Sequence, residues 1–134
     1  MGVIQVYFKY QGSVCSDLDD TKVFIQNILN RLKDVVDDEN LLFDLKLILN
    51  ELVINSVIHG NKCKKEKCVY LYLEILEDTI RIEVSDEGRG IDFDISSYNP
   101  RELKCCGRGL ILVDGLSDEL YIDENRVEVI KYIC

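Results

Sequence analysis

The chain has 134 residues, of which 47% are hydrophobic and 31% charged. It is long enough to bury a core, and we expect one domain spanning residues 1–134. Twenty-five acidic residues against sixteen basic ones give a formal charge of −9. This charge disfavours nucleic acid and anionic membrane surfaces as partners.

No apolar run approaches the roughly 18 residues that span a bilayer. The first ten residues do not have the pattern of a secretion signal. The six cysteines follow no zinc-binding spacing, and we interpret them as reduced thiols. These features predict a cytoplasmic protein without a membrane segment.

The N-terminal part predicts one strand and two helices. Residues 3–10 alternate between apolar and polar and predict a strand, followed by a turn over residues 11–16. Acidic residues then favour a helix start near residue 17, and apolar residues recur at helical spacing to about Val36. The second helix, over residues 41–59, is apolar on nearly all sides and is therefore expected to be buried.

The C-terminal half predicts mainly strands. Gly60 is expected to cap the second helix, and a lysine-rich loop follows, either simply solvated or attracting an acidic partner. The remaining expected elements are strands at 69–77 and 79–86, an irregular segment at 87–106, a helix at 109–116 and a hairpin of strands 120–123 and 127–132. This order predicts an α+β fold: a two-layer sandwich with a mixed, mostly antiparallel sheet and helices on one face.

Two polar side chains interrupt the apolar second helix. Glu51 and Asn55 are four residues apart, so they lie on one helix face. A buried carboxylate without a partner costs several kcal/mol, so a ligand is expected on that face. An Asn carbonyl suits Mg²⁺, and a nearby Glu can act as a general base. The alternative is that this stripe is the solvated edge of the helix.

Two glycine-containing segments lie further along the chain. The first, Asp86-Glu87-Gly88-Arg89-Gly90-Ile91, follows a predicted strand and combines a carboxylate acceptor with a backbone that a ligand can approach closely. The second, Gly107-Arg108-Gly109-Leu110, opens a helix whose free N–H groups form an anion site, and Arg108 adds charge for a phosphate. Either segment alone is also compatible with an ordinary turn.

In order and spacing, the three segments together resemble the ATP-binding module of the GHKL superfamily, which includes DNA gyrase and histidine kinases. Residues 51–60 resemble its N box, residues 86–91 its first glycine box and residues 107–110 its second. The histidine after the N box and the run from Gly107 to Leu120 resemble the anti-sigma factor serine/threonine kinase branch. The resemblance covers the chain from about residue 17 and implies the Bergerat-type ATP-binding fold.

The resemblance also implies roles for individual residues. Asn55 would ligate the Mg²⁺ that bridges the ATP phosphates, and Glu51 would be the general base on the attacking hydroxyl. Asp86 would accept a hydrogen bond from the adenine amino group. The remaining implied nucleotide contacts are Gly88, Gly90 and Ile91 of the first glycine box and Gly107, Arg108, Gly109 and Leu110 of the second, with residues 92–106 as a lid.

The branch transfers phosphate from ATP to a serine on an anti-anti-sigma protein, binds a sigma factor and forms a homodimer through the open face of the fold. This chain departs from the family where a Gly-Thr turn often precedes the last strand, because residues 123–126 here read Asp-Glu-Asn-Arg. Arg31 is the candidate for a partner contact from the first helix.

Two alternative functions stay open. The first is a regulatory binding module in which ATP sets only the conformation, although an intact Glu51 favours an enzyme. The second is a stand-alone histidine-kinase-type catalytic domain. Its phosphoacceptor would have to lie on another protein, because His59 falls inside the proposed nucleotide site.

Overall fold

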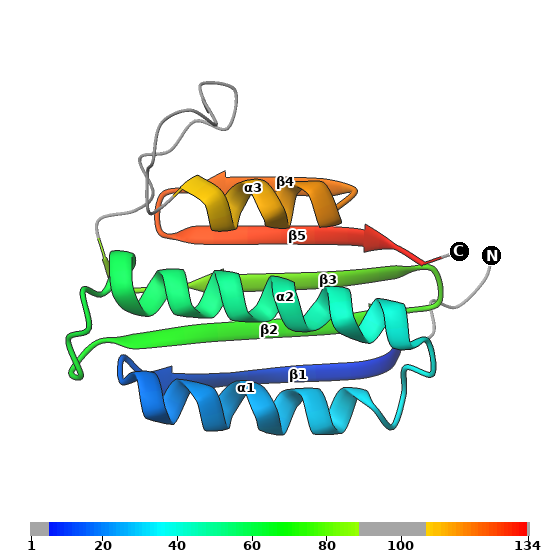
Figure 1. Ribbon diagram of the computed structural model, residues 1–134, viewed down its shortest axis with the longest axis horizontal. Helices are drawn as coiled ribbons and strands as arrows, with labels where there is room; N and C mark the ends of the chain where they lie inside the picture. Colours follow the sequence, from blue (N-terminus) through cyan, green and yellow to red (C-terminus); the bar gives the residue numbers. More distant parts are fainter. Residues whose placement is uncertain (1–5, 89–106, 134) are drawn as a thin grey trace.

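The protein is built on a five-stranded antiparallel sheet in the strand order β1-β2-β3-β5-β4. The computed structural model describes residues 6–88 and 107–133. Figure 1 shows α1, α2 and α3 side by side over one face of this sheet, which confirms the predicted α+β sandwich. The elements are β1 (Val6–Cys15), α1 (Leu18–Leu32), α2 (Glu39–Asn55), η1 (Ser56–Gly60), β2 (Cys68–Leu76), β3 (Thr79–Ser85), α3 (Gly107–Leu116), β4 (Glu119–Asp123) and β5 (Arg126–Tyr132).

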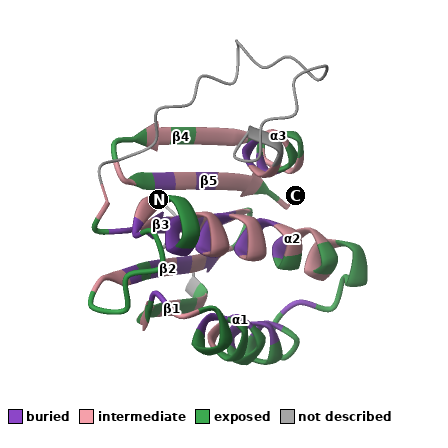
Figure 2. Ribbon diagram, turned by 60° about the vertical axis from the view of Figure 1, so that its left-hand side comes forward, coloured by how far each residue is buried: buried purple, intermediate pink, exposed green. Residues whose placement is uncertain are grey.

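The core lies between the sheet and α2, where buried residues of both layers meet (Figure 2). Alternation along β2 and β3 turns their apolar side chains toward the helices, as predicted. Full burial of one such Leu or Ile contributes about 1.5–3 kcal/mol to folding. Helix α2 is thereby held firmly, and it carries the polar residues of the candidate site. Its buried side chains are Leu45, Ile48, Leu49, Leu52 and Val53.

Strand β1 is longer than its sequence predicted. The prediction of a turn over residues 11–16 is wrong, because the strand continues to Cys15 and pairs with the first residues of β2. Gly12 and Ser13 favour a turn locally, but the hydrogen-bond ladder with β2 prevails over that preference. Residues 3–5 of the predicted strand lie outside the described part of the chain.

The two long helices begin at aspartate caps. Asp17 accepts hydrogen bonds from two backbone N–H groups of α1 at 2.9 and 3.1 Å, and Asp38 does the same for α2 at 2.9 and 3.2 Å. The Asp38 cap starts α2 at Glu39, two residues before the predicted start. Helix α1 ends at Leu32, short of the predicted Val36, which is nevertheless buried in the turn that follows.

The remaining connections follow the sequence closely. Strands β2 and β3 meet at a hairpin after Leu76, and β4 and β5 meet at Glu124-Asn125, where Glu124 has φ 54°. Helix α3 begins at Gly107, two residues before its predicted start. In the described ranges, no helix is both long and apolar enough to cross a bilayer.

Candidate functional site

The three polar segments of the sequence meet at one end of the molecule. The C-terminal end of α2, the residues after β3 and the first turn of α3 all lie at the left side of Figure 1. They come from positions roughly 20 to 60 residues apart, so the fold, and not the local sequence, brings them together.

Helix α3 lies directly against the polar face of α2. A Cβ added at Gly109 would overlap Glu51 Oε2 and would lie 3.0 Å from Asn55 Nδ2. With glycine at this position, α3 approaches both side chains closely, and a larger residue would require the Glu51 carboxylate to move. The fold therefore brings the polar face of α2 next to the second glycine segment.

Asn55 leaves its side-chain nitrogen buried and without a hydrogen-bond partner among the residues that the structure describes. Such a group costs about 1–3 kcal/mol if nothing satisfies it. The amide also carries a carbonyl oxygen, which is a ligand for hard cations such as Mg²⁺. The orphaned amide therefore fits a site where a ligand supplies the missing partner.

Few protein groups besides Asn55 are available to a metal ion here. Within residues 6–88 and 107–133, no cluster of three or more His, Cys, Asp or Glu side chains is arranged as a metal site. Mg²⁺ commonly takes one or two protein ligands and completes its shell with water and substrate phosphates. The chemistry of the donors therefore suits a magnesium–nucleotide complex better than a protein-enclosed metal.

Asp86 lies in a tight polar pocket at the end of β3, where its residue is 6% exposed. Burial raises the pKa of its carboxyl above the ordinary 3.8, while hydrogen bonds from the Gly88 N–H, at 2.8 Å, and from Ser56 act in the opposite direction. Gly60 is required here, because a Cβ there would overlap the Asp86 carboxylate. A Cβ added at Gly88 would likewise overlap a neighbour, the carbonyl oxygen of Gly60.

Gly60 does not cap α2 in the predicted way. The end of the helix widens into the π-helical η1, and the left-handed residues are Lys62 and Cys63, with φ 53° and 57°. The predicted cap is therefore wrong, and the glycine serves instead to admit Asp86. Single π-helical turns of this kind often occur at functional sites.

Asn61 is a site residue that the sequence alone did not reveal. It is fully buried, and its amide nitrogen donates to Ser16 Oγ and to the Cys68 carbonyl, both at 2.9 Å. Its Oδ1 accepts from the Glu87 N–H at 2.8 Å. Asn61 thus joins β1, β2 and the turn after Asp86, and its only signal in the sequence is its place beside Gly60.

Asn125 stands in the segment that departs from the family's Gly-Thr turn. Its carbonyl oxygen accepts from the Asp86 N–H at 3.0 Å, and its side-chain amide donates to the Asp86 carbonyl. This residue therefore fixes the backbone of Asp86 from the β4–β5 hairpin. The turn that replaces the family's Gly-Thr turn is therefore hydrogen-bonded to the candidate site. The sequence alone did not predict this contact.

Several predicted site residues are placed only in part. Gly90, Ile91 and the expected lid at 92–106 lie outside the described residues, and only the backbone of Gly107 and Arg108 is described, as the first turn of α3. Leu110 is buried in the core, where its side chain attaches α3 to the other layer.

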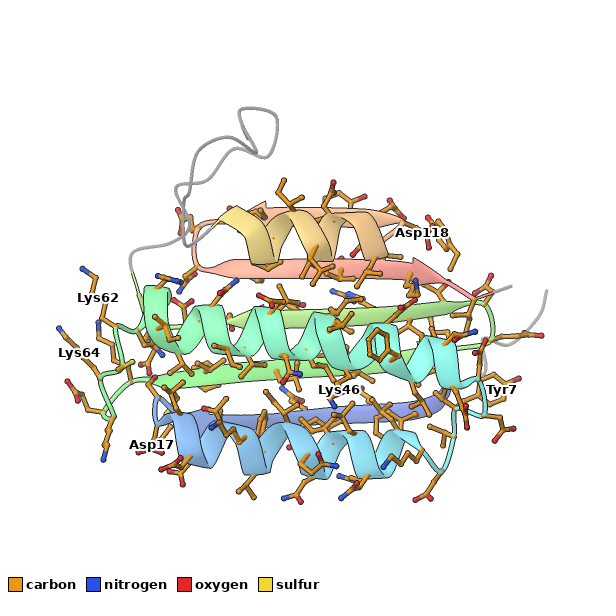
Figure 3. The ribbon with its side chains drawn as sticks, in the orientation of Figure 1. Tyr7, Asp17, Lys46, Lys62, Lys64 and Asp118 are labelled. Carbon is orange, nitrogen blue, oxygen red and sulfur yellow. The ribbon has the colours of Figure 1, made fainter. Side chains whose placement is uncertain are left out.

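Two further charged features are Arg31 and the lysine-rich loop, which lies beside this pocket and whose Lys67 acts to lower the pKa of Asp86. Arg31 of α1 stacks over the rings of Phe8 and Tyr10, 6.0 and 5.5 Å from their centroids. Lys62 and Lys64 point outward from the loop after η1 (Figure 3). Arg31 is thus held against β1 by its aromatic neighbours, in a region of the surface separate from the lysine-rich loop.

The structure thus combines an antiparallel sheet, covered on one face by helices, with a carboxylate and an amide that face a glycine at a helix start. A family model described as a histidine kinase-like ATPase domain matches residues 16–131. The chain belongs to this family.

Named relatives fall in one branch. The chain is 30% identical to the serine-protein kinase RsbW of Staphylococcus aureus (strain bovine RF122 / ET3-1) over 125 residues, covering 84% of this chain and 77% of the relative. It is 33% identical to RsbW of Staphylococcus epidermidis over 103 residues, covering 67% and 65% of the two chains. It is also 34% identical to the anti-sigma F factor of Clostridium perfringens (strain SM101 / Type A) over 92 residues. This match covers 63% of this chain and 66% of the relative.

Proposed function

We propose that this protein is an ATP-dependent serine/threonine protein kinase that binds a sigma factor and phosphorylates a serine on an anti-anti-sigma protein. The observation that carries the proposal is the contact of Gly109 with Glu51 and Asn55. A carboxylate and a side-chain amide lie there at the start of a helix, in a chain whose relatives are named serine-protein kinase and anti-sigma factor, and this supports the proposal. The proposal treats residues 1–134 as one cytoplasmic domain.

In this proposal, Asn55 holds Mg²⁺ through its side-chain oxygen, and the metal neutralises phosphate charge when ATP is bound. Glu51 lies one helical turn earlier and accepts the proton of the serine hydroxyl as that oxygen attacks the γ-phosphorus. The phosphoryl group passes to serine, and ADP leaves. The free N–H groups in the first turn of α3, beside Gly109, bind phosphate oxygens.

Asp86 is the adenine-recognition residue of the proposal. Its buried carboxylate accepts a hydrogen bond from the adenine amino group, and Asn61 and Asn125 hold the turn that presents it. Gly88 and Gly90 leave room for the base and ribose. The remaining proposed nucleotide contacts are Ile91, Gly107 and Arg108, with residues 92–106 as the lid. Leu110 would contribute only its backbone, because its side chain is buried in the core.

Phosphoryl transfer tests the proposal directly. The purified chain is incubated with radiolabelled ATP, Mg²⁺ and an anti-anti-sigma protein from the same genome. We expect label on one serine of that protein, and no label when the serine is replaced by alanine. If the chain binds ATP and sigma factor yet transfers nothing, the kinase proposal fails and the ATP-gated binding module takes its place.

Asp86→Asn is expected to weaken ATP binding by roughly 10- to 100-fold, the equivalent of one charge-assisted hydrogen bond. The substitution keeps the shape of the side chain but removes its charge and sets an NH₂ group against the adenine amino group. Isothermal calorimetry measures the change, with Asp123→Asn as a matched control in an exposed strand. Equal affinity for the wild type and Asp86→Asn would reject this pocket as the adenine site.

The raised pKa of Asp86 adds a pH dependence. The carboxylate must be ionised to accept the adenine hydrogen bond, so wild-type ATP affinity is expected to fall on acidification. Because burial raises the pKa, the fall begins at a higher pH than for an ordinary aspartate with pKa 3.8. Asp86→Asn should lack this component of the pH profile.

The open face of the sheet is the proposed homodimer surface. Tyr70, Tyr121 and Tyr132 are 46–55% exposed there. Arg81 pairs with Glu128 at 3.2 Å across neighbouring strands of the same face. Tyrosines provide rigid, amphipathic contact area. Because Arg81 and Glu128 already pair with each other, burying these charges in a dimer interface costs less desolvation free energy.

A dimer is therefore expected in light scattering at micromolar concentration. Tyr70→Lys should shift the mass toward the monomer, because it places a new charge on the open face. Phe43→Lys is the matched control, since Phe43 is 60% exposed on α2, on the opposite side of the sheet. A monomer at all concentrations, with and without ATP, would contradict the dimer.

A further inference from the structure

Two cysteines face each other across the first two strands. Cys15 ends β1 and Cys68 begins β2, and they are direct partners in the antiparallel register. Directly opposed residues of an antiparallel pair point to the same face of the sheet. Both thiols are free, so the two side chains are neighbours without a bond between them.

The backbone hydrogen bonds define which kind of pair this is. The next pair along, Ser16 and Lys67, is joined by a bond from the Ser16 N–H to the Lys67 carbonyl at 3.2 Å. Hydrogen-bonded and non-hydrogen-bonded pairs alternate along an antiparallel ladder, so Cys15 and Cys68 form a non-hydrogen-bonded pair. Cα atoms of such pairs are about 4.5 Å apart, inside the range of about 4.4–6.8 Å found in disulfides.

The outward partners of Cys68 support this assignment. Its N–H donates to the Glu87 carboxylate, and its carbonyl accepts from Asn61 Nδ2 at 2.9 Å. The carbonyl of Cys15 accepts from the Asp17 N–H at 2.8 Å. In a non-hydrogen-bonded pair the backbone polar groups point away from the partner strand, as they do here.

The pair is accessible from solvent. Cys15 is exposed and Cys68 is half-buried. The nearby Glu87 carboxylate raises the pKa of the Tyr70 phenol, and the hydrogen bond between this phenol and the Cys68 side chain acts in the same direction. Cys68 shares the open face of β2 with Tyr70, and Cys15 ends the edge strand β1. A small oxidant can therefore reach the pair at the edge of the sheet without entering the core.

We propose that Cys15 and Cys68 form a reversible intramolecular disulfide when the protein meets hydrogen peroxide. One thiol is oxidised by the peroxide to a sulfenic acid, with release of one water molecule. The sulfur of the second thiol attacks that sulfur, the S–S bond forms, and a second water leaves. Two thiols and one H₂O₂ thus give one disulfide and two water molecules, and an external thiol reverses the reaction by exchange.

The disulfide would enclose the helix that carries the candidate site. The closed loop runs from residue 15 to residue 68 and contains α1, α2 and η1, with Glu51 and Asn55. Closing a loop of this length restricts the unfolded chain strongly. Oxidation is therefore expected to raise the melting temperature by on the order of 10 °C. This inference goes beyond the proposed kinase activity and does not depend on it.

Peptide mapping tests the pairing. The reduced, purified chain is treated with a small excess of hydrogen peroxide, blocked with iodoacetamide and digested with trypsin without reductant. The expected product is a cross-link between peptides 10–22 and 68–81, each of which contains a single cysteine. Cys63 falls in a separate dipeptide, 63–64, so mass spectrometry distinguishes it.

Three serine variants make the result decisive. Cys15→Ser and Cys68→Ser should each lose the cross-link and the peroxide-dependent rise in melting temperature. Cys63→Ser, the matched control in the exposed loop, should keep both. The melting temperature of each variant in its reduced state serves as the check that the variant folds. A cross-link mainly to Cys63 or to any other cysteine, a disulfide-linked dimer, or two unlinked thiols after peroxide would overturn the inference.

Discussion

Glu51→Gln is expected to lower kcat for phosphoryl transfer by about 10²- to 10⁴-fold, while the Kd for Mg-ATP stays close to the wild-type value. The substitution keeps the size of the side chain and its packing beside Gly109. It removes only the ability to accept the serine proton, and that transfer takes place in the transition state. The loss should therefore fall on kcat and not on nucleotide affinity.

The measurement is single-turnover transfer of radiolabelled phosphate, combined with calorimetric titration of ATP. Glu39→Gln is the matched control, because Glu39 lies in the first turn of the same helix, at its opposite end. Its kcat should stay within about twofold of the wild type. A Glu51→Gln protein that transfers phosphate at the wild-type rate would exclude Glu51 as the general base.

Asn55→Ala is expected to abolish phosphoryl transfer and to weaken Mg-dependent ATP binding, without loss of fold stability. The side-chain nitrogen of Asn55 is buried and has no partner in the described part of the chain. Removing an unsatisfied polar group is nearly neutral for the folded state, or even stabilising. A residue retained for structure would behave in the opposite way, and its replacement by alanine would destabilise the fold.

Two measurements separate these cases. Thermal unfolding without nucleotide should give Asn55→Ala a melting temperature equal to or above that of the wild type. ATP titration with Mg²⁺ and with EDTA should show that the metal-dependent part of the affinity has gone. Asn27→Ala, at an exposed position of α1, controls for the loss of an asparagine. Unchanged Mg-ATP affinity in Asn55→Ala would refute the metal-ligand role.

The two variants together distinguish the functions that the sequence left open. A kinase loses transfer in both variants but loses Mg-ATP affinity only in Asn55→Ala. A nucleotide-gated binding module would tolerate Glu51→Gln in every assay, since it has no use for a general base. Sigma-factor binding by Glu51→Gln therefore serves as an internal check that the variant is intact.

The sequence by itself determined the order and type of the elements. Strands β2 and β3 carry strict alternation, and the many apolar residues after Leu41 predicted a buried second helix, so local patterns predicted these elements without further context. The motifs around Glu51, Asp86 and Gly109 were also visible in the sequence. Each motif alone was also compatible with an ordinary turn or a solvated helix edge. The resemblance of all three together to the GHKL ATP-binding module implied a nucleotide site.

Only the tertiary structure decided how these motifs meet. The contact of Gly109 with Glu51 and Asn55 spans more than fifty residues, and the extension of β1 over its predicted turn depends on pairing with β2. Asn61 and Asn125 look like ordinary loop residues in the sequence, yet both hold the turn around Asp86. Long-range hydrogen bonds and close backbone approaches leave no periodic pattern in a single sequence, because their partners are set by the packing of distant segments.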